Sequence, residues 1–295
     1  MEPLLENICV TSYNSTGFSN SVQNFISTLT IFSNIICLQE HFLLDAKDKK
    51  HSNTNKLRKS FSEKFDMFIT PAFKENTQVG KGRGKGGLAT IWNKSLTKYV
   101  SKINCQNFRI QATKFAFPSG SFLLLNSYFP CDPRTTNFDE TELVNLLAEI
   151  RRLMLQEKCV YNLVLGDLNT HFLRQTRFTS LVKNFFEDIN FKIFWELSDP
   201  INGPIQEVDF TFSLICNNKM SSSVIDHFVS NDVLLNAVTE AGVIHAGDNP
   251  SNHSPIFAKF KMNGIDPSVE QVRGQKKVNW AKATENEKLN YHADL

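Results

Sequence analysis

An acid and an amide lie two residues apart in the segment 166–169, Gly-Asp-Leu-Asn, directly after the apolar run 163–165. The apolar run predicts a short buried strand, and Gly166 allows a sharp turn that brings Asp167 and Asn169 to the carboxyl end of that strand. At such a position a carboxylate can activate a water molecule while a carboxamide holds a phosphate oxygen. The same residues also fit an Asx turn without any chemistry, so the pair needs partners elsewhere in the chain.

Polar residues also stand at the ends of other predicted strands. They are Asn14 in strand 7–14, Glu40 in strand 35–40, Asn126 and Tyr128 in strand 121–130, and His253 just before strand 256–260. A further carboxylate, Asp226, lies inside the predicted strand 223–229. Apolar residues recur at helical spacing from Leu143 to Leu153, which predicts a helix between strand 121–130 and the Asp167 strand. Strand, helix and strand in this order form the crossover unit of an α/β sheet, whose strand ends hold the functional residues.

The composition indicates a globular chain without a bulk electrostatic preference for polyanions. Its 295 residues are 41% hydrophobic and include 25 Phe, which is enough for a sizeable core, and the net charge is only +2. Positive charge is concentrated locally, in residues 45–60 and in the glycine-rich stretch 80–87 with Lys81, Arg83 and Lys85. The stretch lacks the spacing of a phosphate-binding loop and precedes a strand rather than a helix. We expect a flexible cationic loop that contacts a nucleic-acid backbone.

The sequence indicates an intracellular protein that is not secreted and has no membrane partner. The first residues lack the apolar run of a signal peptide, and no later run approaches the length of a membrane span. The six cysteines are scattered without disulfide or zinc spacing. Glycosylation sequons occur at Asn14, Asn93 and Asn252, and the first and last fall on candidate site residues. A glycan there would block the site, which further argues against secretion.

Together, the strand-end residues resemble the motifs of the endonuclease/exonuclease/phosphatase superfamily. The matching positions, in chain order, are Asn14, Gln39-Glu40, Asn126-x-Tyr128-x-Pro130, Gly166-Asp167-x-Asn169, Ile225-Asp226-His227 and Ser251-x-His253-Ser254-Pro255. The resemblance implies a four-layered α/β sandwich, with two mixed β-sheets packed face to face and helices outside. The resemblance spans residues 7 to 262, and we expect residues 1–262 to form the nuclease domain and residues 263–295 a charged linker or connector.

Within this superfamily the chain is most similar to the apurinic-endonuclease-like domain of LINE-type (non-LTR) retrotransposon proteins. The run 210–213, Phe-Thr-Phe-Ser, and the following segment 223–227 look like the DNA-probing hairpin of those elements, within a polar excursion from 199 to 222. The tail around Trp280, Ala283 and Tyr291 is similar to the connector that precedes their reverse transcriptase. The resemblance thus implies that a reverse transcriptase is covalently continuous with this domain.

The resemblance also implies a role for each site residue. The catalytic residues would be Asp167, Asn169, His253, Asp226, Tyr128 and Asn14; the metal ligands Glu40 and Asn252; and the DNA-binding residues Thr211, Ser213, Ser223, Lys81, Arg83 and Lys85. Glu40 suits Mg²⁺, which is a hard ion that prefers oxygen ligands, and Mn²⁺ is an expected substitute. Asp167 would activate water, and His253, held by Asp226, would contact a non-bridging phosphate oxygen.

One position departs from the family pattern. The family usually has Ser-Asp-His where this chain has Ser251-Asn252-His253, so a carboxylate that helps to bind the metal is replaced by a neutral amide. An amide oxygen can still bind Mg²⁺ but contributes no charge. We expect weaker metal binding rather than loss of activity.

The function implied by the resemblance is a Mg²⁺-dependent endonuclease that acts in the nucleus. It would nick one strand of double-stranded DNA and leave a 3′-hydroxyl primer for target-primed reverse transcription of a retrotransposon. The alternatives are a cellular abasic-site (AP) repair endonuclease of the same fold and a catalytically silent DNA-binding module. Relatives that cleave phosphoinositides or sphingomyelin share the core motifs, but the basic loops fit DNA better.

Overall fold

The computed structural model describes residues 7–45, 47, 53–73, 84–132, 139–197, 203–217 and 219–262 of the chain. The chain divides into one compact unit, Met1–Asn263, and a following unit, Gly264–Leu295, which lies outside the described residues. The connector predicted for 263–295 and the predicted DNA contacts of Lys81 and Arg83 also lie outside them. The domain limits 1–262 and 263–295 therefore stay a prediction.

The first sheet has six strands in the order β13-β14-β1-β2-β4-β3. They are β1 (Asn7–Asn14), β2 (Ile35–Gln39), β3 (Phe65–Thr70), β4 (Leu88–Asn93), β13 (Val238–Val243) and β14 (Ile256–Lys261). β1 and β2 are parallel, and the other neighbours are antiparallel. The predicted strands at 7–14, 35–40 and 256–260 belong to this sheet, and so does the strand expected directly after the glycine-rich stretch 80–87, which is β4.

The second sheet also has six strands, in the order β5-β6-β7-β8-β12-β9. They are β5 (Val100–Ile103), β6 (Ile110–Phe117), β7 (Gly120–Tyr128), β8 (Tyr161–Asp167), β9 (Phe191–Ile193) and β12 (Asp226–Asn231). β7 and β8 are parallel and joined by α3 (Thr141–Glu157), which confirms the predicted crossover. A separate two-stranded sheet is formed by β10 (Phe212–Cys216) and β11 (Lys219–Ser223).

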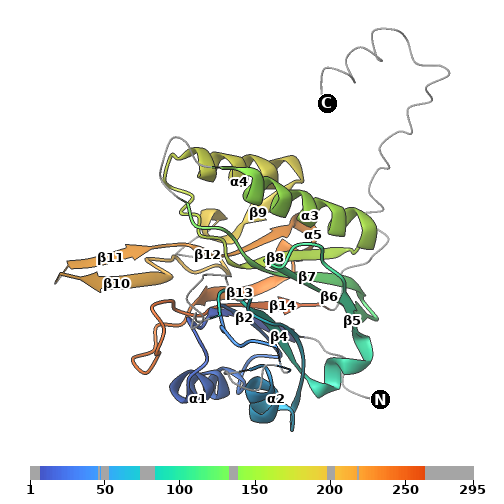
Figure 1. Cartoon of the computed structure of the whole chain (residues 1–295). Coiled ribbons are helices and arrows are strands. Elements are labelled where there is room, and N and C mark those ends of the chain that lie inside the picture. The colour runs from blue at the N-terminus through green and yellow to red at the C-terminus, as the bar shows by residue number, and fades with distance from the viewer. Residues whose placement is uncertain are drawn as a thin grey trace, which may run out of the picture. The chain divides into compact units, whose positions relative to one another are not determined.

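Helices cover the outer face of each sheet, and the two sheets face one another (Figure 1). The first sheet carries α1 (Asn20–Leu29) and α2 (Asn55–Phe61), and the second carries α3 and α4 (Arg177–Asp188). The short elements α5 (Asp232–Leu235), η1 (Lys94–Tyr99) and η2 (Phe194–Leu197) complete the chain. This order of layers confirms the predicted four-layered sandwich of two mixed sheets. The described helices include none with the length and apolarity to cross a membrane.

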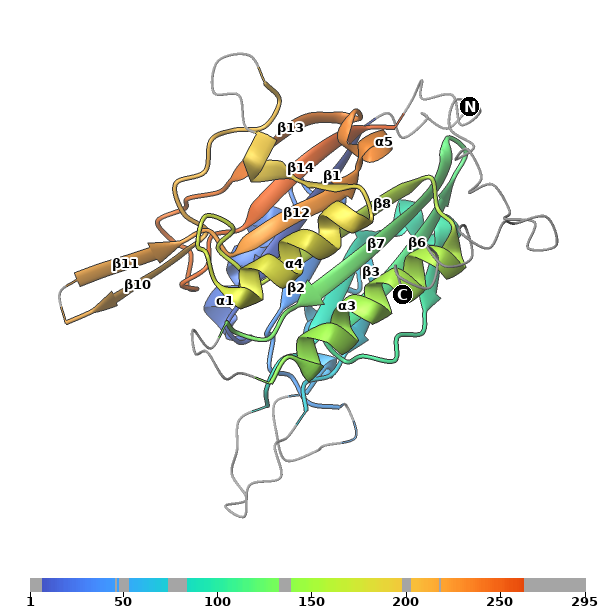
Figure 2. The same ribbon diagram turned by 90° about the horizontal axis from the view of Figure 1, so that it is seen from above.

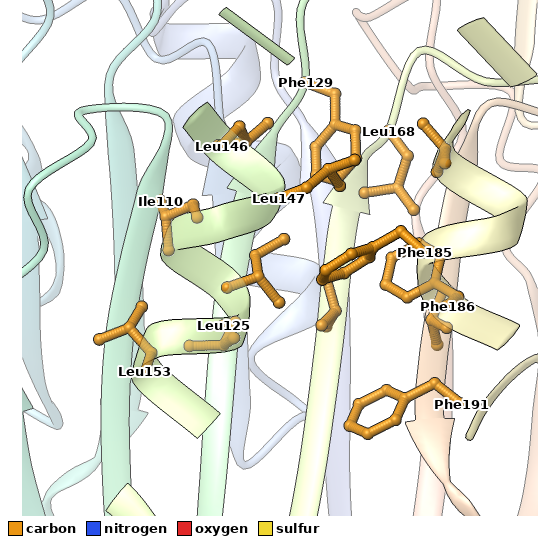
Figure 3. Packing of buried hydrophobic residues seen from close by; sticks show 14 of the residues in the cluster. Ile110, Leu125, Phe129, Leu146, Leu147, Leu153, Leu168, Phe185, Phe186 and Phe191 are labelled. Carbon is orange, nitrogen blue, oxygen red and sulfur yellow. The ribbon is translucent and has the colours of Figure 1, made fainter. Parts of the chain in front are cut away.

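Each helix packs by an amphipathic face that the sequence predicts. In α1 the apolar positions Val22, Phe25, Ile26 and Leu29 are all buried, and Ser19 Oγ caps the helix by accepting from the Val22 backbone N–H at 3.2 Å. On the second sheet, Leu146 and Leu153 of α3 and Phe186 of α4 pack with strand residues such as Leu125 in one cluster (Figure 3). This cluster packs α3 and α4 against the outer face of the second sheet.

The layer between the two sheets changes from aromatic to polar. At one end Phe122 of β7 approaches Phe260 of β14, with 6.4 Å between ring centroids. At the other end Gln39 Nε2 donates to Asn126 Oδ1 at 2.7 Å, and Asn126 Nδ2 donates to the carbonyls of Leu38 and Ala89. Buried amides of this kind are stable only when hydrogen-bonded, so they fix the distance and register between the sheets. The candidate site lies directly beyond these amides.

The hairpin predicted within residues 199–222 forms, but over a shorter range. β10 and β11 pair in antiparallel register from Phe212↔Ser223 to Cys216↔Lys219 and project away from the sandwich (Figure 2). The predicted strand 223–229 is divided, because Ser223 ends β11 and Asp226 begins β12. Asp226 is thus the first residue of its strand rather than an interior one.

Candidate active site

Strand register brings the candidate residues together. β1 and β2 are parallel and place Asn14 beside Gln39, the residue before Glu40. β7 and β8 are parallel and place Tyr128 beside Asp167, while antiparallel β12 places Asp226 beside Asp167. Both sheets therefore present their polar strand ends at the same edge of the sandwich.

Asn14 connects the two sheets at this edge. Its Nδ2 donates to Glu40 Oε2 at 3.0 Å and to Asp167 Oδ2 at 2.9 Å, and its Oδ1 accepts from the Thr16 backbone N–H at 3.0 Å. Because one nitrogen contacts both carboxylates, their oxygens are at most about 6 Å apart, within the reach of one hydrated metal ion and its phosphate. Both amide hydrogens are used, so Asn14 orients the two carboxylates in this structure, and the catalytic role implied by the resemblance stays a prediction.

Gly166 has a different role from the predicted turn. It remains within β8 with a φ of +130°, and a Cβ at this residue would lie 2.0 Å from the Ser127 carbonyl oxygen of β7. Only glycine permits this close approach of two backbones. The chain turns later, at Asn169, which has a φ of +47°. The sharp turn predicted at Gly166 is therefore wrong in position, because Gly166 and Asp167 are still within β8 and the backbone turns only at Asn169.

Asn169 is held inside the turn by its own hydrogen bonds. Its backbone N–H donates to Asp167 Oδ1 at 2.9 Å, and its Nδ2 donates to the Phe129 carbonyl at 2.9 Å. One oxygen of Asp167 is thus fixed by Asn169 and the other by Asn14. Asp167 is held from both sides, which sets the direction of its carboxylate.

Asp226 and His253 form a buried ion pair. The distance from His253 Nδ1 to Asp226 Oδ2 is 2.9 Å, and both side chains are almost fully buried. Burial alone would lower the pKa of His253, but the Asp226 carboxylate and its hydrogen bond, with further attraction from Asp167 and Glu40, raise it to about 9. The imidazole is therefore cationic at neutral pH, as predicted for a group that contacts a phosphate oxygen.

Asp167 is a buried carboxyl group whose negative charge is only partly balanced by the neighbouring His253 cation. Burial raises its pKa, the His253 cation opposes this, and the negative charges of Asp226 and Glu40 add to the rise, which places the pKa at about 7. A carboxyl with a pKa near the working pH is suited to accept a proton from water. Its environment also favours the binding of a further cation, since Glu40, Asp167 and Asp226 outnumber the single imidazolium.

Tyr128 is the protonated hydroxyl of the site. Burial and the nearby charges of Glu40 and Asp167 raise the pKa of the phenol, and its hydroxyl is hydrogen-bonded to Glu40. The guanidinium of Arg109 lies over the Tyr128 ring, with Cζ 5.2 Å from the centroid, and Nη1 approaches the Tyr128 carbonyl at 3.4 Å. Tyr128 thus remains an O–H donor beside the carboxylates.

The base of the hairpin supports Asp226 and His253. The Thr211 hydroxyl accepts from the backbone N–H groups of Ile225 and Asp226, both at 3.0 Å, and Thr211 is fully buried. The sequence assigns Thr211 to DNA, but its buried hydroxyl instead positions Asp226. Phe212 packs on the His253 ring, with 4.9 Å between centroids.

The other predicted DNA contacts lie in different surroundings. Ser213 donates its backbone N–H to the Asn252 carbonyl at 2.9 Å, and Asn252 itself is exposed. Ser223 is buried, and its Oγ accepts from Arg174 Nη2 at 2.8 Å. Lys85 is exposed and pairs its backbone with Phe73. Of the three predicted DNA-binding residues, Lys85 is exposed, Ser213 is half-buried and Ser223 is buried. Asn252, which the resemblance implies as a metal ligand, is exposed, and its role stays a prediction.

The residues fit a divalent metal ion with oxygen ligands. Among the described residues, Asp167, Asp226 and His253 offer ligand atoms that all lie within 4.8 Å of one another. His253 Nδ1 is engaged by Asp226, however, and a protonated imidazole cannot bind a metal. The hydrogen bonds of Asn14 point instead to Glu40 and Asp167 as the oxygen ligands for Mg²⁺.

Two residues of the matched motifs, Ser251 and His227, make contacts for which the sequence pattern predicts no role. Ser251 Oγ donates to the Asn14 carbonyl at 2.8 Å and accepts from the His253 backbone N–H at 3.1 Å. His227 is fully buried beneath Asp226, with Nε2 2.8 Å from the Thr170 carbonyl, and burial lowers its pKa to about 4. Asn14 and Thr170 are distant from these residues in sequence, so only the fold reveals the two contacts.

Comparisons with known proteins show the fold. No family model and no curated protein matches the sequence. Among solved structures, an AP endonuclease from Leishmania major has a TM-score of 0.63 at 15% identity and covers 87% of this chain and 88% of its own. The endonuclease domain of TRAS1, a telomere-specific non-LTR retrotransposon, has a TM-score of 0.58 at 14% identity, covering 87% of this chain and 100% of its own.

A third structure bears the family description itself. An endonuclease/exonuclease/phosphatase family protein from Leptotrichia buccalis has a TM-score of 0.57 at 13% identity and covers 86% of this chain and 99% of its own. The AP endonuclease and the retrotransposon domain are thus both distant neighbours, and neither identity decides between them. The chain has the α/β sandwich fold of the endonuclease/exonuclease/phosphatase proteins.

Proposed function

We propose that this chain is a Mg²⁺-dependent endonuclease that hydrolyses one strand of double-stranded DNA. The observation that carries the proposal is the meeting of Asn14, Glu40, Asp167, Asp226 and His253, from five separate segments, at one edge of the two sheets. A proton acceptor, oxygen ligands for a metal and a fixed imidazolium are the groups that phosphodiester hydrolysis requires.

The residues divide the chemistry in a defined way. Asp167 takes a proton from the attacking water, and the water oxygen bonds to phosphorus. The bond from phosphorus to O3′ breaks at the same time, and O3′ takes a proton from solvent. The His253 cation stabilises the charge on a non-bridging oxygen, and Tyr128 donates a hydrogen bond to the same phosphate. A Mg²⁺ ion held by Glu40 and Asp167 would neutralise the charge that develops on the phosphate. The products are a 3′-hydroxyl and a 5′-phosphate.

We further propose that the nick serves target-primed reverse transcription of a retrotransposon, in the nucleus and as part of a longer protein with a reverse transcriptase. The likeness to the TRAS1 endonuclease domain supports this role. So does the hairpin, where Ile215 and Met220 face each other across the strands and are 72% and 67% exposed. Exposed apolar side chains next to a DNA-cutting site fit a surface that probes intact duplex.

A repair role is the second candidate, because the likeness to the Leishmania AP endonuclease is as strong. Equal amounts of intact duplex and of duplex with a single abasic site distinguish the two roles. We expect nicking of intact duplex at a rate within about tenfold of the abasic one. A preference for the abasic duplex of more than a thousandfold would instead assign repair.

Relaxation of supercoiled plasmid tests the enzyme against a silent DNA-binding module. We expect the wild type to relax the plasmid only with Mg²⁺, and His253→Ala to bind the plasmid without relaxing it. Binding without relaxation by the wild type at every Mg²⁺ concentration would assign the binding module.

A further inference from the structure

Two phenylalanines form an exposed aromatic pair beside the active site. Phe73 follows β3 and Phe108 precedes β6, and their ring centroids are 4.8 Å apart at an interplanar angle of 69°. They are 37% and 51% exposed. Both lie at strand ends that face the site, since Thr70 pairs with Leu88 next to Gln39, and Ile110 pairs with Ser127 next to Tyr128.

Arg109 connects this pair to the active site. Its Cζ lies 5.4 Å from the Phe108 ring centroid and 5.2 Å from the Tyr128 ring centroid, so the guanidinium contacts both rings. Glu142 Oε1 accepts from Arg109 Nε at 2.6 Å and fixes the planar group in place. The guanidinium side chain is only 15% exposed. Phe73, Phe108, Arg109 and Tyr128 form a continuous series of π surfaces from the exterior to the carboxylates.

We propose that Phe73, Phe108 and Arg109, here called the stacking platform, hold one unpaired DNA base next to the scissile phosphate. The inference rests on the proposed function in taking DNA as the ligand. Aromatic faces with an adjacent guanidinium bind bases of any sequence by stacking and by cation–π attraction. The two rings keep part of their apolar surface in contact with water, and a stacked base would cover that surface.

The distances fit a base close to the cut. The centroids of Phe108 and Tyr128 are at most about 11 Å apart, because each is within 5.4 Å of Arg109 Cζ. One strand of duplex DNA rises about 3.4 Å per nucleotide, so the platform reaches a base within about three nucleotides of the phosphate at Tyr128. The cost of unpairing that base is lowest at a weak or mismatched pair. The platform therefore favours cutting beside deformable or mispaired positions.

The platform fits a nucleic acid better than a second copy of the chain. Two partly exposed rings offer far less area than the roughly 800 Å² per partner of a stable protein interface. The neighbouring Lys85 is exposed, and its backbone is paired with Phe73, which places a cation at the outer end of the platform. Positive charge beside the rings complements the phosphates that flank a stacked base.

Binding without Mg²⁺ tests the platform independently of cutting. The probes are a fluorescent thymidine octamer and an octamer of the same backbone without bases, measured by anisotropy in EDTA. We expect the wild type to bind the thymidine octamer about tenfold more tightly than the baseless one. Phe108→Ala should lose this difference and Phe108→Trp should keep it. Phe32→Ala is the matched control, since Phe32 is 45% exposed and precedes β2 at the end opposite Glu40.

The outcomes separate this inference from the proposed function. If Phe108→Ala retains the tenfold difference, or if the wild type shows none, the platform is not a base-stacking site. A change from dimer to monomer in Phe108→Ala on gel filtration would also overturn it, because the rings would then be a protein interface. Loss of base-dependent binding in a protein that nicks no DNA would retain the platform and reject the nuclease. If Phe108→Ala nicks DNA and still binds the thymidine octamer more tightly than the baseless one, the nuclease is retained and the platform is rejected.

Discussion

Asn14 of β1 and Asp167 of β8 belong to different sheets, and a 2.9 Å hydrogen bond from Asn14 Nδ2 to Asp167 Oδ2 joins them at the active site. The same nitrogen holds Glu40, which follows β2. Below this level, the hydrogen bond between Gln39 and Asn126 also crosses from sheet to sheet. The geometry of the carboxylates is therefore set by the packing of the sheets, and no single loop determines it.

Replacement of Asn14 should show this dependence. Asn14→Ala leaves Asp167 Oδ2 and Glu40 Oε2 without their shared donor, so we expect nicking to slow by about a hundredfold. The pKa of Asp167 should rise further, because a hydrogen bond to the charged form is lost. The measurement is single-turnover nicking, with Asn55→Ala as the exposed control on α2. If the nicking rate of Asn14→Ala falls by less than about tenfold, Asn14 does not position the catalytic carboxylates.

The pH dependence of nicking should follow Asp167 and His253. Activity requires Asp167 without its proton and His253 with it, so the rate should rise as pH increases through about 7 and fall above about 9. A bound cation favours the ionised Asp167, so saturating Mg²⁺ should move the acid limb to lower pH. Single-turnover rates from pH 5 to 10 at two Mg²⁺ concentrations measure both limbs.

The variant Asp226→Asn tests whether His253 causes the fall in nicking rate at alkaline pH. Without the Asp226 charge, burial dominates and the pKa of His253 falls, so the alkaline limb should move toward neutral pH. An unchanged alkaline limb in Asp226→Asn would show that His253 is not the titrating acid.

Gly166 is predicted to be irreplaceable for a packing reason. Gly166→Ala places a Cβ 2.0 Å from the Ser127 carbonyl oxygen at a φ that side chains avoid, so we expect a loss of about 2–4 kcal/mol in the free energy of unfolding. Gly247→Ala is the control, because no heavy atom lies within 4 Å of its added Cβ. Urea unfolding of the two variants measures the difference. Equal stability would mean that the two strands can separate at Gly166 without cost.

The variant Asn252→Asp tests whether residue 252 affects the Mg²⁺ concentration that nicking requires. The residue is exposed, so the carboxylate in Asn252→Asp would ionise without a burial penalty. We expect a lower Mg²⁺ concentration for half-maximal nicking, because a negative oxygen ligand binds a hard ion better than a neutral one, with a smaller change in rate at saturation. A higher half-maximal concentration would show that the amide is needed as a hydrogen-bond donor.

The sequence predicts the strands and helices whose apolar residues follow a simple period. β1, β2, β8, α1 and α3 are of this kind, and their ends deliver Asn14, Glu40 and Asp167 to one edge. β6 escaped prediction because its inward face at the polar part of the interlayer carries Gln111 and Thr113, both fully buried. The side chain of Gln111 is hydrogen-bonded to the other sheet, where the Thr90 hydroxyl donates to Gln111 Oε1 at 2.7 Å, and such a partner cannot be read from a local pattern.

The roles of individual site residues depend on contacts between distant segments. Thr211 is indistinguishable in sequence from a surface threonine of a hairpin, yet its hydroxyl binds two backbone N–H groups fourteen and fifteen residues away. Arg109 similarly has no motif, and its place over Tyr128 follows from the pairing of β6 with β7. A chemical type at a strand end can be predicted from sequence, whereas its hydrogen-bond partners require the fold.

Mapping of the cut ends on a mixed-sequence duplex shows whether this chain nicks DNA by Mg²⁺-dependent hydrolysis at Asp167 and His253. One labelled strand is incubated with wild type, with Asp167→Ala and with His253→Ala, with and without Mg²⁺, and the ends are identified chemically. We expect single-strand nicks with 3′-hydroxyl and 5′-phosphate ends, formed by the wild type and only with Mg²⁺. Nicks of the same yield in either variant, or ends with a 3′-phosphate, would contradict it.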